Sequence, residues 1–245
     1  MTIQANDKLV LYTNHLCPWA HRAHIAAAEL GLKFEEHIVD LDTPRTKEYL
    51  AINPRGLVPA LKFNDEIIIE SGIVAAFLAD QYPSHLVPES SAPGGALKRA
   101  RIALFVDAFF SKFQSPLFKI YTASEDELPA VTEAATAGLV KEVEPLLKDA
   151  KPYFGGADKL TLAEVLTGSF VVRLLSLGKA GVYPASFLAS IEQQAPNFWA
   201  WAQKVAVHPS VTGIYDEEKV VTKTKARIEK LRAEKKAGDS RGSRL

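Results

Sequence analysis

The only thiol of this chain stands at a position where a thiol could be activated. Cys17 follows the apolar run at 8–13 and directly precedes Pro18-Trp19. A proline at that point is typical of the first turn of a helix, so we expect the sulfur to face free backbone N–H groups at the positive end of the helix dipole. Both features favour thiolate over thiol. Because the chain has no second cysteine, a thiol from outside must resolve any disulfide that Cys17 forms.

Two further short motifs could bind a ligand beside it. Val58-Pro59 stands at the entrance of an expected strand, where proline fits an edge or a bend, including one made by a cis peptide bond. Such a bend would leave the main chain of Val58 open for pairing. In Glu70-Ser71, Ser71 is a good N-cap at the start of an expected helix, whose N-terminus accepts a carboxylate. Glu70 can pair with an adjacent ammonium, so the pair suits the α-amino acid end of a ligand.

The elements that must position these motifs alternate in the first third of the chain. Apolar runs, helix formers and turn residues predict the order βαβ, helix, ββα. The last two strands form a hairpin joined by Asn64-Asp65. The predicted strands are 8–13, 34–40, 60–63 and 66–69, and the predicted helices are 18–30, 43–51 and 71–82.

The rest of the chain is predicted to be helical. Residues 83–95 contain three prolines and Gly94-Gly95, which interrupt regular structure and indicate a linker. Thr161 and Glu164 have capping-box spacing at the start of one helix. The predicted helices are 97–115, 128–150, 162–177, 184–194 and 198–207. The expected fold class is therefore an α/β domain at 1–82, a linker at 83–95, an all-α domain at 96–215 and a basic tail at 216–245.

Composition and charge exclude several classes of protein. With 245 residues, 47% of them hydrophobic and 24% charged, the chain is an ordinary globular protein without an internal disulfide or a Cys-rich zinc site. Residues 219–245 contain ten Lys or Arg and three Asp or Glu, a net charge of +7, which leaves −7 on the rest. We expect this tail to be a solvated helix with a frayed end rather than a segment that binds nucleic acid or a membrane. The N-terminus lacks a secretory pattern and no apolar stretch reaches about 18 residues, so a cytoplasmic location is expected.

Taken together, the motifs resemble those of the cytosolic glutathione transferases, and most of all the omega class with its fungal and bacterial relatives. The resemblance extends from about residue 8 to about residue 208. It implies a thioredoxin-like N-terminal domain, an all-α C-terminal domain and a homodimer. It rests on Cys17-Pro18-Trp19-Ala20-His21-Arg22, on Asn53-Pro54-Arg55-Gly56-Leu57-Val58-Pro59, on Glu70-Ser71 and on the Pro-rich linker before a helical half.

The resemblance implies a role for each candidate residue. Cys17 would form a mixed disulfide with glutathione, Val58 would pair through its main chain with the cysteinyl part, and Pro59 would be the cis-proline. Glu70 and Ser71 would bind the γ-glutamyl end. The resemblance also implies Arg45 or Lys47 for the glycyl carboxylate, Trp19 at the glutathione site, and an acceptor pocket of Trp19, Phe109, Phe113 and Phe118. Glutathione is then a co-substrate, and no metal is expected.

The expected function is glutathione-dependent thiol transfer or reduction, acting on glutathionylated substrates, disulfides or dehydroascorbate, with a role in detoxification. Cys-Pro-Trp followed by Ala-His-Arg also resembles the glutathionyl-hydroquinone reductases. Those usually carry a longer extension than the sixteen residues before Cys17, which places them second. Chloride intracellular channel proteins share the fold and a similar cysteine motif. We rank them third, because no apolar insertion helix is evident.

Overall fold

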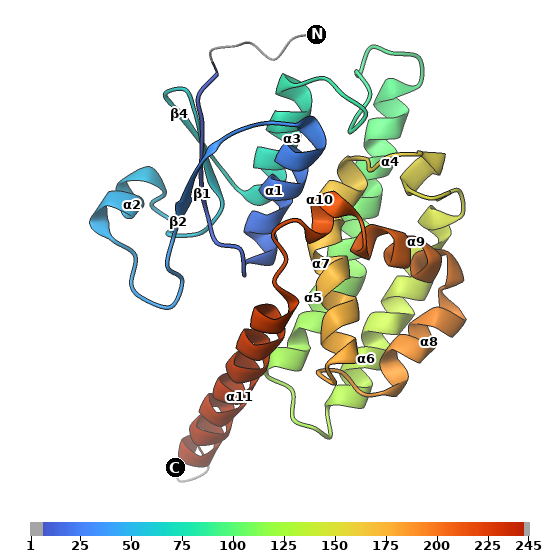
Figure 1. Ribbon diagram of the computed structural model, residues 1–245. Coiled ribbons are helices and arrows are strands. Elements are labelled where there is room, and N and C mark those ends of the chain that lie inside the picture. The colour runs from blue at the N-terminus through green and yellow to red at the C-terminus, as the bar shows by residue number, and fades with distance from the viewer. Residues whose placement is uncertain (1–6, 243–245) are drawn as a thin grey trace.

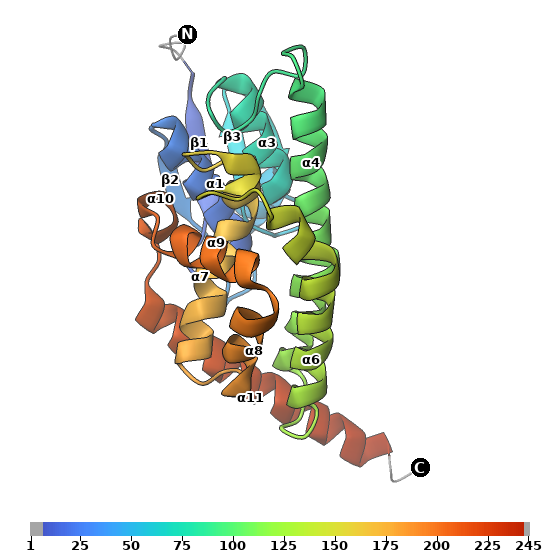
Figure 2. The same ribbon diagram turned by 90° about the vertical axis from the view of Figure 1, so that its right-hand side faces the viewer.

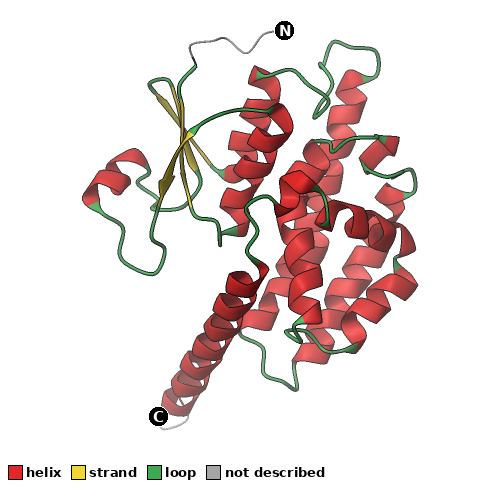
Figure 3. Cartoon of the chain, viewed as in Figure 1, coloured by secondary structure: helices red, strands yellow, loops and turns green. Residues whose placement is uncertain are grey.

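The molecule consists of an N-terminal half built around a small mixed sheet and a larger helical half (Figures 1 and 3). This computed structural model describes residues 7–242, and side chains up to residue 237. The sheet with its helices and the predominantly helical C-terminal region confirm the predicted fold class. Residues 82–94, between the two halves, contain no helix or strand. The exact domain boundaries stay a prediction.

The sheet has the order β2-β1-β3-β4. Strand β1 pairs in parallel with β2 and antiparallel with β3, and β3 pairs antiparallel with β4 through the predicted turn at Asn64-Asp65. Helices α1 and α3 lie together between the sheet and the helical half, whereas α2 lies on the other side (Figure 1). The bounds are β1 Leu9–Thr13, α1 Pro18–Leu30, β2 Glu35–Ile38, α2 Lys47–Ile52, β3 Ala60–Phe63, β4 Glu66–Ile69 and α3 Ser71–Gln81.

Helix α2 is shorter than predicted, and the reason is local. It begins at Lys47 with Thr46 as its N-cap, not at residue 43. Before it, the Arg45 guanidinium donates hydrogen bonds to the carbonyls of Asp40 and Thr43 at 2.8 and 2.7 Å. These bonds satisfy carbonyls outside a helix, so the segment before Thr46 remains a loop.

Two of the predicted long helices change their winding along their length. The predicted helix 97–115 is α4 followed by a π-helical turn η1, and 128–150 is α6 followed by a π turn η3 and a 3₁₀ turn η4. Pro116 and Pro145 follow the two π turns, and proline cannot donate the bond that a regular helix needs there. The bounds are α4 Gly95–Ala108, η1 Phe109–Gln114, α5 Ser115–Leu117, η2 Phe118–Tyr121, α6 Leu128–Gly138, η3 Leu139–Val143, η4 Glu144–Leu147 and η5 Phe154–Gly156.

The helices that contain these two π turns approach each other closely at Gly138. A Cβ atom at Gly138 would lie 2.0 Å from the carbonyl oxygen of Lys112 in η1. No side chain fits into that space, so only glycine permits this contact.

Helix α7 is the centre of the helical half, because its residues 162–177 are all buried. The predicted capping box at its start is confirmed, since Thr161 and Glu164 make both reciprocal bonds. The buried Glu164 carboxylate also accepts from the backbone N–H of Phe154 and from Trp201 Nε1, each at 2.7 Å. The last elements are α7 Leu162–Lys179, α8 Ser186–Gln194, α9 Pro196–Ala206, α10 Pro209–Thr212 and α11 Glu217–Gly242.

The basic tail is helical, as we expected, and the last residues of the end that we expected to be frayed, 243–245, lie outside the described residues. It forms the continuous helix α11, which contacts α7 and η2 while its C-terminal end projects beyond the rest of the molecule (Figures 1 and 2). Val220 and Ile228 are only 3% and 6% exposed. Val220, Ile228 and Leu231 recur at helical spacing, and this sparse apolar face is enough to dock the helix.

Candidate functional site

A cleft of about 1190 Å³ is lined by residues of both halves. The N-terminal half contributes the segment before and at the start of α1, the loop after β2, the loop before β3 and the start of α3. The helical half contributes residues of η1 to η2, of α7 and of α11. Most of the predicted site residues meet here: Cys17, Trp19, Arg45, Val58, Pro59, Glu70, Ser71 and Phe118.

Cys17 occupies the N-cap position of α1, with Pro18 at the first helical position. No side chain caps this end, so the first N–H groups of the helix remain open toward the sulfur. The thiol is half-buried, and Sγ lies 4.0 Å from the carbonyl oxygen of Val58. The predicted position of Cys17 directly before α1 is therefore confirmed, and its sulfur lies opposite the loop that precedes β3.

The Val58–Pro59 peptide bond is cis, as the sequence suggested. Two hydrogen bonds fix the loop in front of it, because Asn53 Nδ2 and the Tyr49 hydroxyl both donate to the carbonyl of Leu57, at 2.7 and 2.5 Å. Val58 lies just before β3 and outside the strand ladder. Its main chain is thus held at the cleft and outside the sheet.

Glu70 and Ser71 meet at the start of α3 in a conformation that the sequence did not predict. Glu70, not Ser71, is the N-cap residue, and its φ of 69° lies in the region that side chains rarely adopt. The Glu70 carboxylate pairs with Arg55 at the surface. The Ser71 hydroxyl accepts a hydrogen bond from Arg22 Nη1 at 3.1 Å. Strained residues of this kind cluster at ligand sites.

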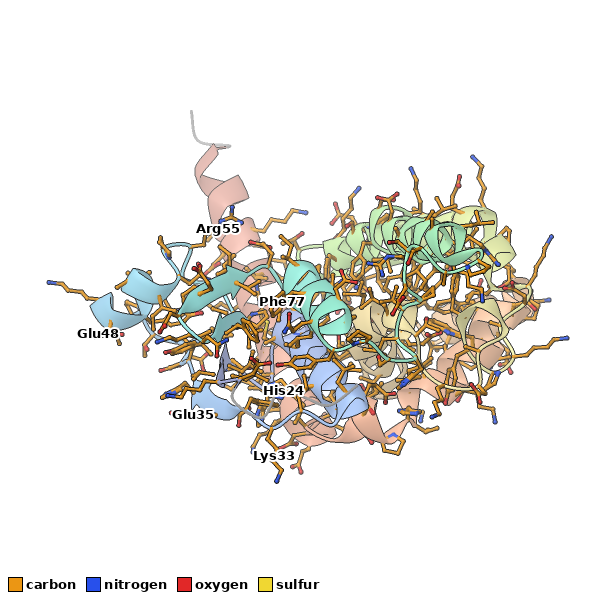
Figure 4. The ribbon with its side chains drawn as sticks, turned by 90° about the horizontal axis from the view of Figure 1, so that it is seen from above. His24, Lys33, Glu35, Glu48, Arg55 and Phe77 are labelled. Carbon is orange, nitrogen blue, oxygen red and sulfur yellow. The ribbon has the colours of Figure 1, made fainter. Side chains whose placement is uncertain are left out.

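Arg45 and Lys47, the two candidates for a carboxylate contact, have different surroundings. Arg45 lines the cleft, and its Nε donates to the carbonyl of Gly56 at 2.9 Å. Lys47, at the first position of α2, does not line the cleft. Figure 4 shows the neighbouring Glu48 at the outer edge of the N-terminal half, whereas His24 lies inside it. The structure therefore favours Arg45.

Two of the predicted acceptor-pocket residues were wrong. Phe109 and Phe113 are completely buried and do not line the cleft, because they face Phe198 in the core at ring distances of 6.5 and 5.5 Å. Phe118 and Trp19 do line it, and the Trp19 ring packs edge-on against Phe170 at 4.7 Å. The helix is apolar on most sides, so its sequence does not reveal which side faces the cleft.

Arg22 is a buried cation beside the site, although it is not among the predicted site residues. Its guanidinium lies 4.5 Å from the Trp19 ring and 4.4 Å from the Phe110 ring, and its Nε donates to the carbonyl of Leu166 at 2.7 Å. Burial lowers the pKa of Arg22 to about 9, and the nearby Cys17 acts in the opposite direction. Arg22 therefore packs on the two rings, donates a hydrogen bond to the Ser71 hydroxyl and interacts electrostatically with Cys17.

Arg173 of α7 is a second buried cation, and it lines the cleft. Its Nη1 donates to His21 Nδ1 and to the carbonyl of Ser169, while Nη2 reaches the carbonyls of His15 and Leu16 at 3.4 and 3.3 Å. Burial lowers the pKa of Arg173 to about 10. No local pattern in the sequence could have placed a residue of α7 against the loop before Cys17.

Neither buried guanidinium forms an ion pair with a carboxylate within the described part of the chain. Cys17 instead interacts electrostatically with both Arg22 and Arg173. A buried cation without a carboxylate partner stabilises a neighbouring anion. The two guanidinium groups therefore place positive charge beside the cleft, where they can stabilise a negative charge on a ligand.

Among the residues that the structure describes, one group of side chains could hold a metal ion. The ligand atoms of His15, His24 and Glu36 all lie within 4.8 Å of one another. His15 Nε2 and His24 Nε2 are 2.7 and 3.4 Å from the same Glu36 oxygen. In this structure both histidines lie against the Glu36 carboxylate, and the expectation that the protein uses no metal stays a prediction.

Comparison with known proteins agrees with this geometry. Residues 16–81 match the family model described as glutathione S-transferase, N-terminal domain. The chain thus has the glutathione transferase fold, and its thioredoxin-like N-terminal half is similar to the N-terminal domain of that family. It is 28% identical to glutathione S-transferase 2 of the fission yeast Schizosaccharomyces pombe, over 82% of this chain and 90% of that protein.

Solved structures show the same architecture. Rice GST1, solved in complex with glutathione, superposes with a TM-score of 0.78 at 26% identity and covers 91% of this chain and 97% of its own. Glutathione transferase Omega 3C from Trametes versicolor superposes with a TM-score of 0.73, and 94% of each chain is covered. At 23% identity, the second likeness concerns the fold alone.

Among residues 7–242, no helix combines the length and the apolar character needed to cross a membrane.

Proposed function

We propose that this protein is a glutathione-dependent thiol transferase or reductase of the omega type, with Cys17 as the nucleophile. The observation that carries the proposal is the position of Cys17, whose sulfur lies at the open N-terminus of α1 and faces the cleft 4.0 Å from the Val58 carbonyl. The N-terminal family match and the glutathione held by the rice relative support glutathione as the thiol.

Glutathione would lie along the N-terminal half of the cleft. The main chain of Val58 would pair with the cysteinyl part, next to Pro59, and would bring the glutathione sulfur to Cys17. Glu70 and Ser71 would bind the ammonium and carboxylate of the γ-glutamyl end. Arg45, which lines the cleft at the opposite end of the Val58 loop, would bind the glycyl carboxylate.

The reaction proceeds by two thiol exchanges. The Cys17 thiolate attacks the glutathione sulfur of a mixed disulfide, a Cys17–glutathione disulfide forms, and the substrate leaves as a thiolate that takes a proton from water. The thiolate of a second glutathione then attacks the glutathione sulfur of this intermediate. Oxidised glutathione leaves and the Cys17 thiolate returns. The helix N-terminus, Arg22 and Arg173 stabilise the anion that appears at Cys17 in each cycle.

Cys17→Ser tests the nucleophile. With hydroxyethyl disulfide and glutathione as substrates, we expect the variant to lose its activity and to keep glutathione binding, because the charged ends of glutathione bind elsewhere. Glu70→Ala is the matched control, which should raise the KM for glutathione first. Mass spectrometry after incubation with oxidised glutathione should show one adduct, on Cys17. Retained reductase activity in purified Cys17→Ser would contradict the mechanism.

A specific observation favours a second candidate, glutathionyl-hydroquinone reduction. The Trp19 ring is 38% exposed, lines the cleft, and lies beside Phe170. An aromatic substrate could stack there while Cys17 attacks the sulfur of its glutathionyl group. The carbon–sulfur bond breaks, the hydroquinone carbon takes a proton, and glutathione then resolves the disulfide. A much higher kcat/KM for a glutathionylated hydroquinone than for small disulfides would favour this reading.

Self-association and location complete the proposal. Leu97 and Leu104 are exposed and lie seven residues apart on one face of α4, and exposed leucines at helical spacing support a homodimer. In sedimentation experiments, the wild type should be a dimer, and Leu104→Glu should contain a larger fraction of monomer. A free cysteine nucleophile is suited to the reducing cytoplasm.

A further inference from the structure

We propose that the cleft wall formed by the helical half, together with Trp19, binds the acceptor substrate; we call it the acceptor half. This wall selects substrates that carry a carboxylate or another negative charge next to an apolar group. The inference deepens the proposed function, on which it rests, by naming the class of acceptor.

Charge is unevenly distributed around the cleft. The helical half contributes Arg173 from α7 and three basic side chains from α11, namely Lys223, Arg227 and Lys230. No acidic residue of the helical half is among the lining residues that the structure describes. The acidic lining residues, Asp40, Asp42 and Glu70, all belong to the N-terminal half.

The acidic side does not neutralise this wall. Glu70 pairs with Arg55, and Asp42 pairs with Lys223 at 2.7 Å, a contact that ties α11 to the N-terminal half. Asp40 caps its own turn through the N–H of Asp42 and the Thr43 hydroxyl. Of the four basic side chains of the wall, only Lys223 is therefore paired with an acidic residue among the described residues that line the cleft.

The three remaining cations are weakly paired. Lys230 lies 4.0 Å from Glu234 in an exposed i,i+4 contact, which contributes little. Arg227 stands 5.7 Å from the Tyr121 ring and, within residues 7–242, forms no ion pair with a carboxylate. Arg173 donates hydrogen bonds to neutral acceptors and, within residues 7–242, forms no ion pair with a carboxylate, although it also lies near Cys17. A wall of partly uncompensated cations attracts anionic ligands and repels cationic ones.

Apolar side chains also line the cleft, and all those named next except Trp19 come from the helical half. Trp19, Phe118, Tyr121 and Phe170 contribute rings, and Leu174, Leu177 and Leu231 contribute aliphatic groups. A site with apolar walls and a few charged groups fixes the orientation of an amphiphilic ligand. The combination fits an apolar or aromatic molecule with an anionic substituent. Glutathione itself is anionic, but its charged ends are assigned above to Arg45, Glu70 and Ser71.

Three small disulfides that differ in charge test the proposal. Cystamine is cationic, hydroxyethyl disulfide is neutral and dithiodipropionate is anionic, and all have similar length. With saturating glutathione, we expect kcat/KM to be about tenfold higher for the anionic than for the neutral disulfide, which corresponds to one charge pair. Cystamine should be the poorest. The preference should shrink at high salt, because screening shortens the range of the charges.

A pair of matched variants locates the effect. In Arg227→Met/Lys230→Met, the ratio of kcat/KM for dithiodipropionate to that for hydroxyethyl disulfide should fall about tenfold. Lys235→Met is the control, because Lys235 is on the same helix but pairs with Glu127 outside the cleft. That variant should keep the wild-type ratio. A raised KM for glutathione in the double variant, with an unchanged ratio, would mean that the cations serve glutathione and would overturn the inference.

An equilibrium measurement separates this inference from the proposed function. Anilinonaphthalene sulfonate and the neutral N-phenylnaphthylamine share their rings and differ in one anionic group. Fluorescence titration should show tighter binding of the sulfonate, and the double variant should remove the difference. If none of the disulfides is turned over but the sulfonate preference holds, the reductase proposal fails and the anionic site stands. Equal affinity for both probes in the wild type would overturn the anionic site.

Discussion

Acidification from pH 7 to pH 5 is expected to destabilise the fold through His24. This side chain is only 6% exposed, and burial lowers its pKa to about 4 despite the nearby Glu36 carboxylate. Its Nε2 lies 2.9 Å from the Thr13 hydroxyl, and the His15 ring stands edge-on at 5.2 Å. In the folded protein at pH 5, His24 therefore remains neutral.

The sign and the size follow from proton linkage. A histidine in the unfolded chain has a pKa near 6.5, so between about pH 6.5 and pH 4 the unfolded state binds a proton that the folded state does not. Stability from this group is present above pH 6.5 and is lost as the pH falls. With a folded pKa of about 4, the loss between pH 7 and pH 5 is about 2 kcal/mol. His21, whose pKa is also lowered by burial, adds to the loss in the same direction.

Urea unfolding followed by tryptophan fluorescence at pH 7, 6 and 5 gives the free energy of unfolding at each pH. His24→Gln removes the titration, so its stability should fall by about 2 kcal/mol less than that of the wild type over this range. The exposed His37, which pairs with Glu35 at the surface, provides the control. His37→Gln should keep the wild-type pH dependence.

The absolute stability of His24→Gln at pH 7 is not the test, because the substitution also changes packing. Only the difference in pH dependence bears on the argument. If His24→Gln loses as much stability between pH 7 and pH 5 as the wild type does, the burial argument for His24 is refuted.

Three further outcomes are expected. Glu164→Gln should lower the free energy of unfolding by about 3 kcal/mol in urea titrations, because one end of the amide becomes a donor facing buried donors; unchanged stability would contradict the network. Phe109→Ala should cost about 4 kcal/mol of stability and leave the KM of the acceptor unchanged, whereas Phe118→Ala should raise that KM at little cost in stability; steady-state kinetics and unfolding curves should separate the two. Arg45→Ala should raise the KM for glutathione about tenfold and Lys47→Ala less than twofold, and the reverse order would return the carboxylate contact to Lys47.

Elements with their own local signals could be predicted from the sequence. Pro18 marks the first turn of α1, Asn64-Asp65 forms the turn between β3 and β4, and Thr161 with Glu164 caps α7. Each signal depends on residues close together in the chain, where backbone geometry restricts the alternatives. The cysteine, the cis-proline loop and the start of α3 are far apart in the sequence, and their contribution to one site was expected from the resemblance to the glutathione transferases, not from local signals.

The other wall of the cleft could not be predicted in this way. Arg173 reaches the loop before Cys17 only because α7 packs against α1, and this contact depends on the whole fold. The tail was correctly predicted to be helical, but its docking was not, because its charge dominates its composition whereas the contact depends on a few apolar residues such as Val220 and Ile228. Phe109 was misassigned because η1 is apolar on several sides, and only packing decides which side faces inward.

Gly138 illustrates how a site can be controlled from a distance. It lies outside the cleft, and the space for its missing side chain is filled by the carbonyl of Lys112. The turn that contains Lys112 leads directly into Gln114, Leu117 and Phe118, which line the acceptor half. A substitution at Gly138 must push this turn aside and would shift the cleft wall with it. In a genetic or directed-evolution screen, such a change would therefore be scored as altered substrate preference, although the mutated residue touches no substrate.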